Sequence, residues 1–173
     1  MYLYILNEEM ITRKLTERDL ETRVNLLNNK KVSQYLNVDE VFNIEKTRKW
    51  FENAKNNTSR YDCVFEVDKK IVGMGGVTDI SLKDQTGSLY IYLAPEYWGC
   101  GCGYTAFTSL CNIGFETLGL NRLYFYAFED NVRGNKLFNR VGFKLEGILR
   151  EHTMHNGVLC NRYIYGLLKK DYK

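Results

Sequence analysis

The part of the chain whose residues are best suited to bind a ligand is a glycine-rich turn at Trp98–Tyr104. It contains three alternating glycines, which lack a Cβ where the backbone must turn tightly or where another molecule comes close. The turn joins an expected strand to an expected helix, and the first N–H groups of a helix have no internal partner and lie at the positive end of its dipole. Strand, glycine turn and helix together predict an anion site, for which a pyrophosphate is a typical occupant.

Other nucleotide-binding signatures fit this turn less well. It lacks the Lys-Ser/Thr pair of a nucleotide P-loop, and Tyr104 stands where a dinucleotide fingerprint has its third glycine or alanine. The turn also lies past the middle of the chain, whereas a dinucleotide-binding unit usually begins at the first strand. The alternative to a ligand site is a turn whose glycines serve only tight packing.

Length and composition describe an ordinary globular protein. The 173 residues predict one domain over 1–173, and 45% apolar with 26% charged residues is typical of soluble chains. The net charge of +3, with no cluster of five or more basic residues, disfavours nucleic acid as a partner. No apolar run is long enough for a signal peptide or a spanning helix, so we expect a cytoplasmic protein without membrane contact.

Cysteine usage supports the same compartment. The five cysteines are odd in number, which favours reduced thiols over a disulfide framework. Cys100 and Cys102 could be read as metal ligands, but the two histidines, His152 and His155, lie far along the chain. Since structural zinc needs four N or S ligands at close spacing, we expect no metal site.

Hydrophobic periodicity predicts the elements that must position the turn. Helices are expected over residues 17–28 (capped by Thr16 with Asp19), 31–36, 44–56, from the glycine turn to about 118, and 131–141. Strands are expected over 11–15, 61–67, 71–80, 88–94, 122–128, 143–150 and 159–168. This order predicts a mixed α/β sheet with helices on both faces, in which residues 88–128 form a right-handed parallel crossover.

Two strand patterns carry further information. Gly73, Gly75 and Gly76 lie within one strand, which predicts a bulge or a group packed close over the backbone. In the strand 88–94, Leu89, Ile91 and Leu93 alternate with Ser88, Tyr90 and Tyr92, so the two sets occupy opposite faces.

Two motifs together resemble a known family. APEYWGCGCGYTAF (94–107) and EDNVRGNKLFNRVGFKLEGILRE (129–151) resemble the GNAT superfamily of acetyl-CoA-dependent N-acetyltransferases, and most closely the branch of ribosomal-protein N-terminal, spermidine and amino-sugar acetyltransferases. The pairing of the motifs is more specific than either one alone. The resemblance implies an α/β (mixed α+β) fold with a mostly antiparallel twisted sheet. It also implies transfer of the acetyl group of acetyl-CoA to a primary amine of a small molecule or a protein N-terminus.

Carried over position by position, the resemblance implies a binding path for the cofactor. The pattern Gln/Arg-x-x-Gly-x-Gly/Ala falls on 98–103, with Trp98 in place of Gln or Arg. Backbone N–H groups of 99–104 would bind the pyrophosphate, residues 91–93 would pair with the pantetheine amides as an added strand, and an N–H near Leu93 would face the thioester carbonyl. The cofactor contacts implied are Ile91, Tyr92, Leu93, Trp98, Gly99, Cys100, Gly101, Cys102, Gly103, Tyr104, Asn131, Asn135 and Phe138.

Asn131 has two interpretations, which are compatible. It matches an asparagine that bonds the pantetheine arm in many family members, and it is also a good helix N-cap. Asn135 and Lys136 are weaker candidates for cofactor contacts.

The catalytic groups depart from the family pattern. A tyrosine that commonly protonates the leaving thiolate is replaced by Phe138, and the two positions that often hold glutamate are occupied by Tyr126 and Ser88. Acid–base help is worth about 10²–10⁴-fold, so the reaction can survive its loss. We predict Tyr126, Ser88 and Tyr92 as the groups that donate a proton or order a water. The alternative is that such rings only pack under a helix.

Other polar candidates near the expected cleft are Asp79, Glu129, Asp130, His152 and His155, the histidines in an expected polar hairpin over 151–161. Phe138 and the missing glutamates also leave open a non-catalytic acyl-CoA-binding or regulatory module, and a nucleotide-binding protein is a third reading. The acceptor amine is not readable from the sequence. A polyamine would require several cleft carboxylates, and no obvious cluster is present. A homodimer is compatible with the resemblance.

Overall fold

A single twisted sheet forms the centre of the computed structural model, which describes residues 9–38, 41–155 and 157–173. The strands follow one another in the order β1-β2-β3-β4-β5-β7-β6, and every neighbouring pair is antiparallel except β4 with β5. The predicted mixed, mostly antiparallel sheet is therefore confirmed. Its strands are β1 (Ile11–Lys14), β2 (Tyr61–Val67), β3 (Lys70–Ser81), β4 (Thr86–Leu93), β5 (Arg122–Phe128), β6 (Lys144–His155) and β7 (Val158–Leu168).

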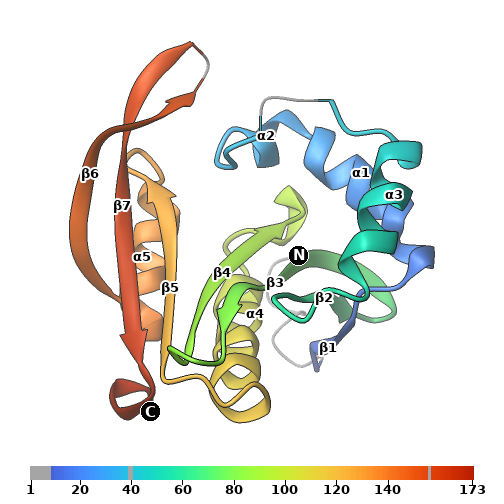
Figure 1. The fold of residues 1–173 in the computed structure, drawn as a ribbon. Helices are drawn as coiled ribbons and strands as arrows, with labels where there is room; N and C mark the ends of the chain where they lie inside the picture. The colour runs from blue at the N-terminus through green and yellow to red at the C-terminus, as the bar shows by residue number, and fades with distance from the viewer. Residues whose placement is uncertain (1–8, 39–40, 156) are drawn as a thin grey trace.

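Helices cover both faces of this sheet, as predicted (Figure 1). On one face, Leu26 and Leu27 of the first helix pack with Val64 and Met74 of the sheet. On the other face, Phe107 belongs to a larger apolar cluster that also holds side chains of β2, β5 and β7. The helices are α1 (Leu20–Asn28), α2 (Lys30–Ser33) and α3 (Ile44–Ala54) on the first face, and α4 (Cys102–Asn112) and α5 (Val132–Val141) on the second.

The parallel pair β4 and β5 is joined over only a short stretch. Pairing runs from Thr86 with Arg122 to Ser88 with Tyr124, although β4 continues to Leu93. Figure 1 shows the two strands diverging beyond this stretch in a V. Since a strand pair exchanges its N–H and C=O groups across the ladder, the separation leaves part of the β4 edge without a protein strand beside it.

The alternation in β4 places its two sets of side chains as predicted. Leu89, Ile91 and Leu93 pack in the cluster beneath α4, and Tyr90 and Tyr92 pack in the cluster beneath α1 and α2. The strand therefore presents aliphatic side chains to one helix layer and tyrosines to the other.

The glycines of β3 meet both expectations raised by the sequence. A Cβ on Gly76 would lie 2.3 Å from the carbonyl oxygen of Tyr61, and one on Gly73 would lie 2.6 Å from that of Tyr92. The register between β2 and β3 also shifts between Phe65 and Glu66. Close backbone approach and a bulge occur together in this strand.

Element ends differ from the prediction in places. The first helix begins with a 3₁₀ turn over Glu17–Asp19, held by the predicted Thr16–Asp19 capping box. The second is shorter than expected. The polar hairpin expected over 151–161 is present, but β6 is longer than predicted: it continues to His155, so that Thr153 pairs with Cys160 and His155 with Val158. A register shift between Leu149 and Thr153 lets the ladder resume, which local polarity does not reveal.

Asp19 is a buried anchor, and its removal gives a stability prediction. The carboxylate is 1% exposed and accepts two hydrogen bonds of 2.7 Å from Arg13, which also pairs with Glu66, and two more from Thr16. Because Asp19→Asn would leave the Arg13 charge short of a partner in a part-buried site, we expect the free energy of unfolding at pH 7 to fall by about 3 kcal/mol. Urea unfolding measures this.

The stability that Asp19→Asn loses should also depend on pH. Burial alone would raise the pKa of Asp19, but hydrogen bonds from Arg13 and Thr16 outweigh it, and the pKa lies below its usual range. A depressed folded-state pKa contributes stability above about pH 4 that is lost as pH falls through the folded value. The difference between wild type and Asp19→Asn should shrink in that window. Glu17→Gln, at a side chain 69% exposed, is the control, and an equal effect there would contradict the prediction.

Candidate active site

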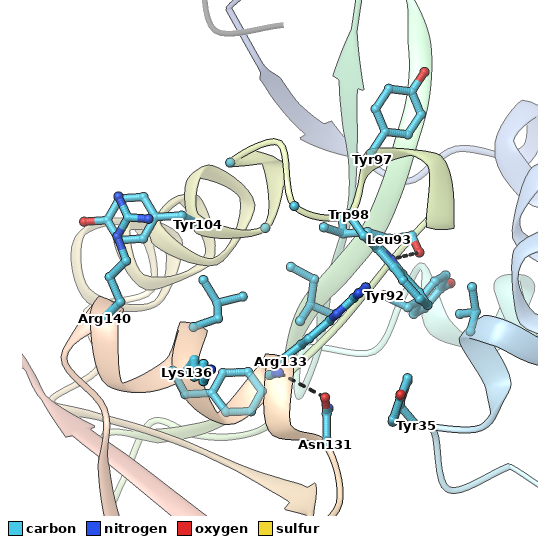
Figure 2. Close-up of a pocket in the computed structure, with 18 of the residues that line it drawn as sticks. Tyr35, Tyr92, Leu93, Tyr97, Trp98, Tyr104, Asn131, Arg133, Lys136 and Arg140 are labelled. Carbon is cyan, nitrogen blue, oxygen red and sulfur yellow. Dashed lines mark hydrogen bonds between the residues drawn. The ribbon is translucent and has the colours of Figure 1, made fainter. Parts of the chain in front are cut away.

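A cavity of about 610 Å³ lies between the glycine turn and α5 (Figure 2). The end of β4 forms one wall, the turn with the start of α4 another, and the first turns of α5 a third, while α2 contributes side chains from the opposite sheet face. The residues lining it are Val32, Tyr35, Leu36, Ile91, Tyr92, Leu93, Tyr97, Trp98, Gly99, Gly101, Gly103, Tyr104, Asn131, Arg133, Gly134, Lys136, Leu137, Phe138 and Arg140.

The turn has the geometry of an anion cradle. Gly99 and Gly101 have φ of +82° and +94°, and a Cβ on either would meet no atom within 4 Å, so both face open space. The N–H groups of Gly99, Cys100 and Gly101 find no hydrogen-bond partner in the described chain. Gly101 is also the N-cap of α4 and brings no side chain to cap it. Free N–H groups at a helix start, without side chains in the way, fit a phosphate group.

Three cations complete this end of the cavity. Arg133, Lys136 and Arg140 are spaced by three and four residues, which places them on one face of α5, and all three line the cavity. Figure 2 shows them on the α5 side, with the Arg140 guanidinium against the ring of Tyr104, 4.6 Å from its centroid. The sequence reasoning missed Arg133 and Arg140, although their spacing on a predicted helix was the signal for them.

Trp98 acts within the protein. Its indole N–H donates to the carbonyl oxygen of Leu93 at 3.0 Å, which fastens the turn to the end of β4 (Figure 2). Its ring meets that of Tyr35 edge-on at 6.4 Å. The residue that replaces the Gln or Arg of the family pattern therefore forms a wall of the cavity and fixes the turn.

Three residues expected to contact the cofactor do not line the cavity with their side chains. Cys100 donates through sulfur to the carbonyl oxygen of Tyr97 and lies 3.1 Å from the sulfur of Cys102. Cys102 is buried, and burial raises the pKa of its thiol to about 12. Asn135 is held away by Tyr165, whose hydroxyl donates to it at 3.2 Å.

Asn131 serves as the helix cap and also lies at the site. Its side-chain oxygen accepts from the N–H of Gly134 at 3.0 Å, and the residue lines the cavity. The amide nitrogen is left over for another partner, so the two interpretations of this residue are compatible in the structure.

A second cavity, of about 380 Å³, adjoins the first. Both have Tyr35, Leu36, Ile91, Tyr92, Asn131 and Phe138 in their lining. The second reaches the opposite sheet face, where Arg23 of α1, Ser88 and Tyr90 of β4, Tyr126 of β5 and Arg162 of β7 line it. Two ligands could therefore meet at the shared wall, beside the point where β4 and β5 separate.

The three predicted catalytic residues all line the second cavity. Tyr126 is 38% exposed and its ring stacks on that of His152 at 5.9 Å, whereas Ser88 is buried. The hydroxyl of Tyr92 contacts the sulfur of Met74 at 3.5 Å, and burial raises its pKa to about 12, so it is a neutral group near pH 7. Phe138 is buried among aromatic rings and forms part of the shared wall.

The remaining polar candidates are not brought into either cavity. Asp79, Glu129, Asp130, His152 and His155 are absent from both linings. Glu129 accepts instead from the Tyr163 hydroxyl at 3.2 Å, and the ring of His155 lies 4.5 Å from that of Phe128. Among the described residues, no group of three His, Cys, Asp or Glu could hold a metal ion, and no helix is long and apolar enough to cross a membrane.

Comparisons with known proteins agree with this architecture. Spermidine N(1)-acetyltransferase of Vibrio cholerae is 24% identical over 88% of this chain and 88% of its own, and the N-acetyltransferase YoaA of Bacillus subtilis, which is uncharacterised, is 24% identical over 98% of both. The crystal structure of the spermidine N-acetyltransferase from Vibrio cholerae in complex with CoA and spermine shares the fold, with a TM-score of 0.91 and 22% identity over 94% of this chain and 97% of that one.

The family itself is shown by a further match. The family model of the acetyltransferase (GNAT) domain matches residues 9–144, which include the glycine turn and the whole of α5. Acetyl-CoA is the co-substrate of this family, and the reaction is acetyl transfer to an amine. The resemblance seen in the two motifs is confirmed, and the chain belongs to the GNAT acetyltransferase family.

Proposed function

We propose that the chain binds acetyl-CoA in the first cavity and transfers its acetyl group directly to a small-molecule amine in the second. The observation that carries this proposal is the wall shared by the two cavities where β4 and β5 separate. Because the two cavities have lining residues in common, a donor in one and an acceptor in the other would lie next to each other. The reaction would then take place within a ternary complex.

The phosphate end of the co-substrate is matched by the turn and by α5. The unpartnered N–H groups of residues 99–101 and the cations Arg133, Lys136 and Arg140 would bind the phosphates. The β4 edge at residues 91–93 would pair with the pantetheine amides, and Asn131 would supply its free amide nitrogen.

The transfer requires an amine that has lost a proton and a thiolate that departs as the new amide bond forms. Tyr126 and Ser88 line the acceptor side, where their hydroxyl groups can order a water that takes the amine proton. Tyr92 is the one of the three predicted groups that lines both cavities, and this supports it as the proposed proton donor to the departing thiolate. Its high pKa keeps the proton on the oxygen at neutral pH.

Calorimetry with acetyl-CoA and a thiol-release assay with a panel of amines test this proposal. We expect binding of acetyl-CoA and amine-dependent release of CoA thiol. Absence of acetyl-CoA binding would exclude the proposal. Binding without release would favour the second candidate function, a non-catalytic acyl-CoA-binding module, which Phe138 supports because it lacks the hydroxyl that commonly protonates the thiolate.

We further propose that two copies associate through the β6–β7 hairpin in the cytoplasm. β6 is an edge strand, and Leu145, Ile148, Met154, Val158 and Leu159 are between 46% and 63% exposed on the hairpin. The five cysteines are free, which fits a reducing compartment. Light scattering after size exclusion should give twice the mass of 20.3 kDa, and Ile148→Lys should give the monomer mass; a wild-type monomer would contradict this.

A further inference from the structure

The second cavity is lined by three arginines, and their charges are not equally balanced. Arg23 comes from α1, Arg60 from the residue before β2, and Arg162 from β7. Among the residues that the structure describes, no Asp or Glu contributes to the lining. The acceptor side of the cleft is therefore cationic along its described walls.

Arg60 is neutralised within the protein. Its guanidinium makes two hydrogen bonds of 2.7 Å to the carboxylate of Asp62, and Asp62 also accepts from the Tyr90 hydroxyl. This bidentate pair fixes the side chain and uses its charge, so Arg60 has little left for a ligand.

Arg23 has no such partner among the described residues. Its guanidinium carbon lies 4.0 Å from the centroid of the Trp50 ring, and its Nη1 is buried without a hydrogen-bond partner in the described chain. Stacking on an aromatic ring holds a guanidinium in place but leaves its in-plane N–H groups free to donate.

Arg162 also lines this cavity and has no carboxylate partner among the described residues. One Nη donates to the carbonyl oxygen of Tyr126 at 3.0 Å, the group lies over the rings of Tyr126 and Phe128, and Nε is buried without a partner in the described chain. Burial lowers the pKa of Arg162, which reflects the cost of holding this cation away from water.

The geometry points to a small acceptor that carries a carboxylate or a phosphate beside its amine, with the guanidinium of Arg23 or Arg162 binding that anionic group. Guanidinium N–H groups match both anions in a forked geometry, and both arginines line the cavity without a carboxylate partner among the described residues. This inference rests on the proposed function, because the second cavity holds an acceptor only if the chain acetylates amines. A polyamine, which brings only positive charge, would be repelled.

Matched amine pairs test the inference. Thiol release from acetyl-CoA is measured at pH 8 with glycine against glycinamide, glucosamine 6-phosphate against glucosamine, and spermidine. We expect kcat/KM to favour the anionic member of at least one pair by about 10- to 100-fold, as expected for hydrogen bonds to a charged group. The glycine pair tests for recognition of a carboxylate, and the glucosamine pair tests for recognition of a phosphate. The inference would be overturned if the neutral member were used as well as the anionic member in both pairs, or if spermidine were used as well as the preferred anionic amine.

Two variants link the preference to its residues. In at least one of Arg23→Gln and Arg162→Gln, the ratio of kcat/KM within the preferred pair should fall toward one. Arg48→Gln, which removes the same charge from a side chain 60% exposed and outside both cavities, should leave the ratio as in wild type. A ratio that survives in both cavity variants would contradict the assignment.

Calorimetry keeps the inference separate from the proposed function. The anionic and neutral members are titrated into protein saturated with CoA, and acetyl-CoA is titrated into each variant by itself. If the anionic members bind and the neutral members do not, this result supports the inference even without turnover. If acetyl-CoA binds but no anionic member of either pair binds or is acetylated, the inference fails while the cofactor site stands.

Discussion

Gly101→Ala is expected to weaken acetyl-CoA binding by about 10- to 100-fold, because in the proposed function the N–H groups of this turn would donate hydrogen bonds to the charged phosphates. Gly101 has φ of +94° and its Cβ would enter the open space of the turn. An alanine there either fills the space next to the phosphate or shifts the backbone out of the left-handed region, and both move the N–H groups of residues 99–101. Calorimetry with acetyl-CoA measures the loss directly.

A second glycine separates this effect from backbone strain. Gly119 has φ of +67°, a Cβ added to it would meet no atom within 4 Å, and the residue lies outside both cavities. Gly119→Ala should therefore cost a similar stability, about 1 kcal/mol, while leaving acetyl-CoA affinity unchanged. Equal losses of affinity in the two variants would show that the turn has no special role.

Phe138→Tyr is expected to raise kcat by about tenfold or more, since general acid catalysis contributes about 10²–10⁴-fold in a fully arranged site. Phe138 lies in the wall shared by the two cavities, where a hydroxyl could protonate the departing thiolate. The ring packs 4.4 Å from that of Phe125, so the surroundings already hold an aromatic side chain in place. Steady-state kinetics with a saturating amine measure kcat, and the KM for acetyl-CoA should change little.

The control is Phe138→Leu, which alters the packing at the same position without adding a hydroxyl. It should not raise kcat, and thermal unfolding of both variants shows whether the aromatic cluster tolerates the change. A folded Phe138→Tyr protein with unchanged kcat would mean that another group, such as Tyr92, already protonates the thiolate.

The fold could be predicted where local chemistry decides it. The Thr16–Asp19 capping box and Gly142, which ends α5 with φ of +112°, set helix boundaries through bonds within a few residues. The alternation in β4 identified both of its faces. The end of β6 was missed, because a polar strand at the edge of a sheet carries little alternation and its ladder depends on the partner strand.

In the candidate site, too, the local features could be predicted, whereas the features that depend on distant parts of the chain could not. The glycine turn is a local feature, so its tight geometry at Gly99 and Gly101 could be predicted from the residues alone. The side chain of Asn135 could not be placed, because Tyr165, thirty residues on, holds it. Arg23 and Arg162 come from opposite ends of the chain, and only the folded sheet reveals that they line one cavity.

β4 and β5 separate where their hydrogen-bonded pairing ends, at Ser88 and Tyr124. The two cavities that share lining residues near this point can differ in how freely their residues change during evolution. In the proposed function the first cavity binds the donor through main-chain groups and the α5 cations, whereas the second is lined by side chains from α1, β4, β5 and β7. Substitutions at residues that line only the second cavity, such as Arg23 and Arg162, would therefore change substrate choice and leave the first cavity intact. A library of variants that aims to change the acceptor amine should therefore vary the residues that line only the second cavity.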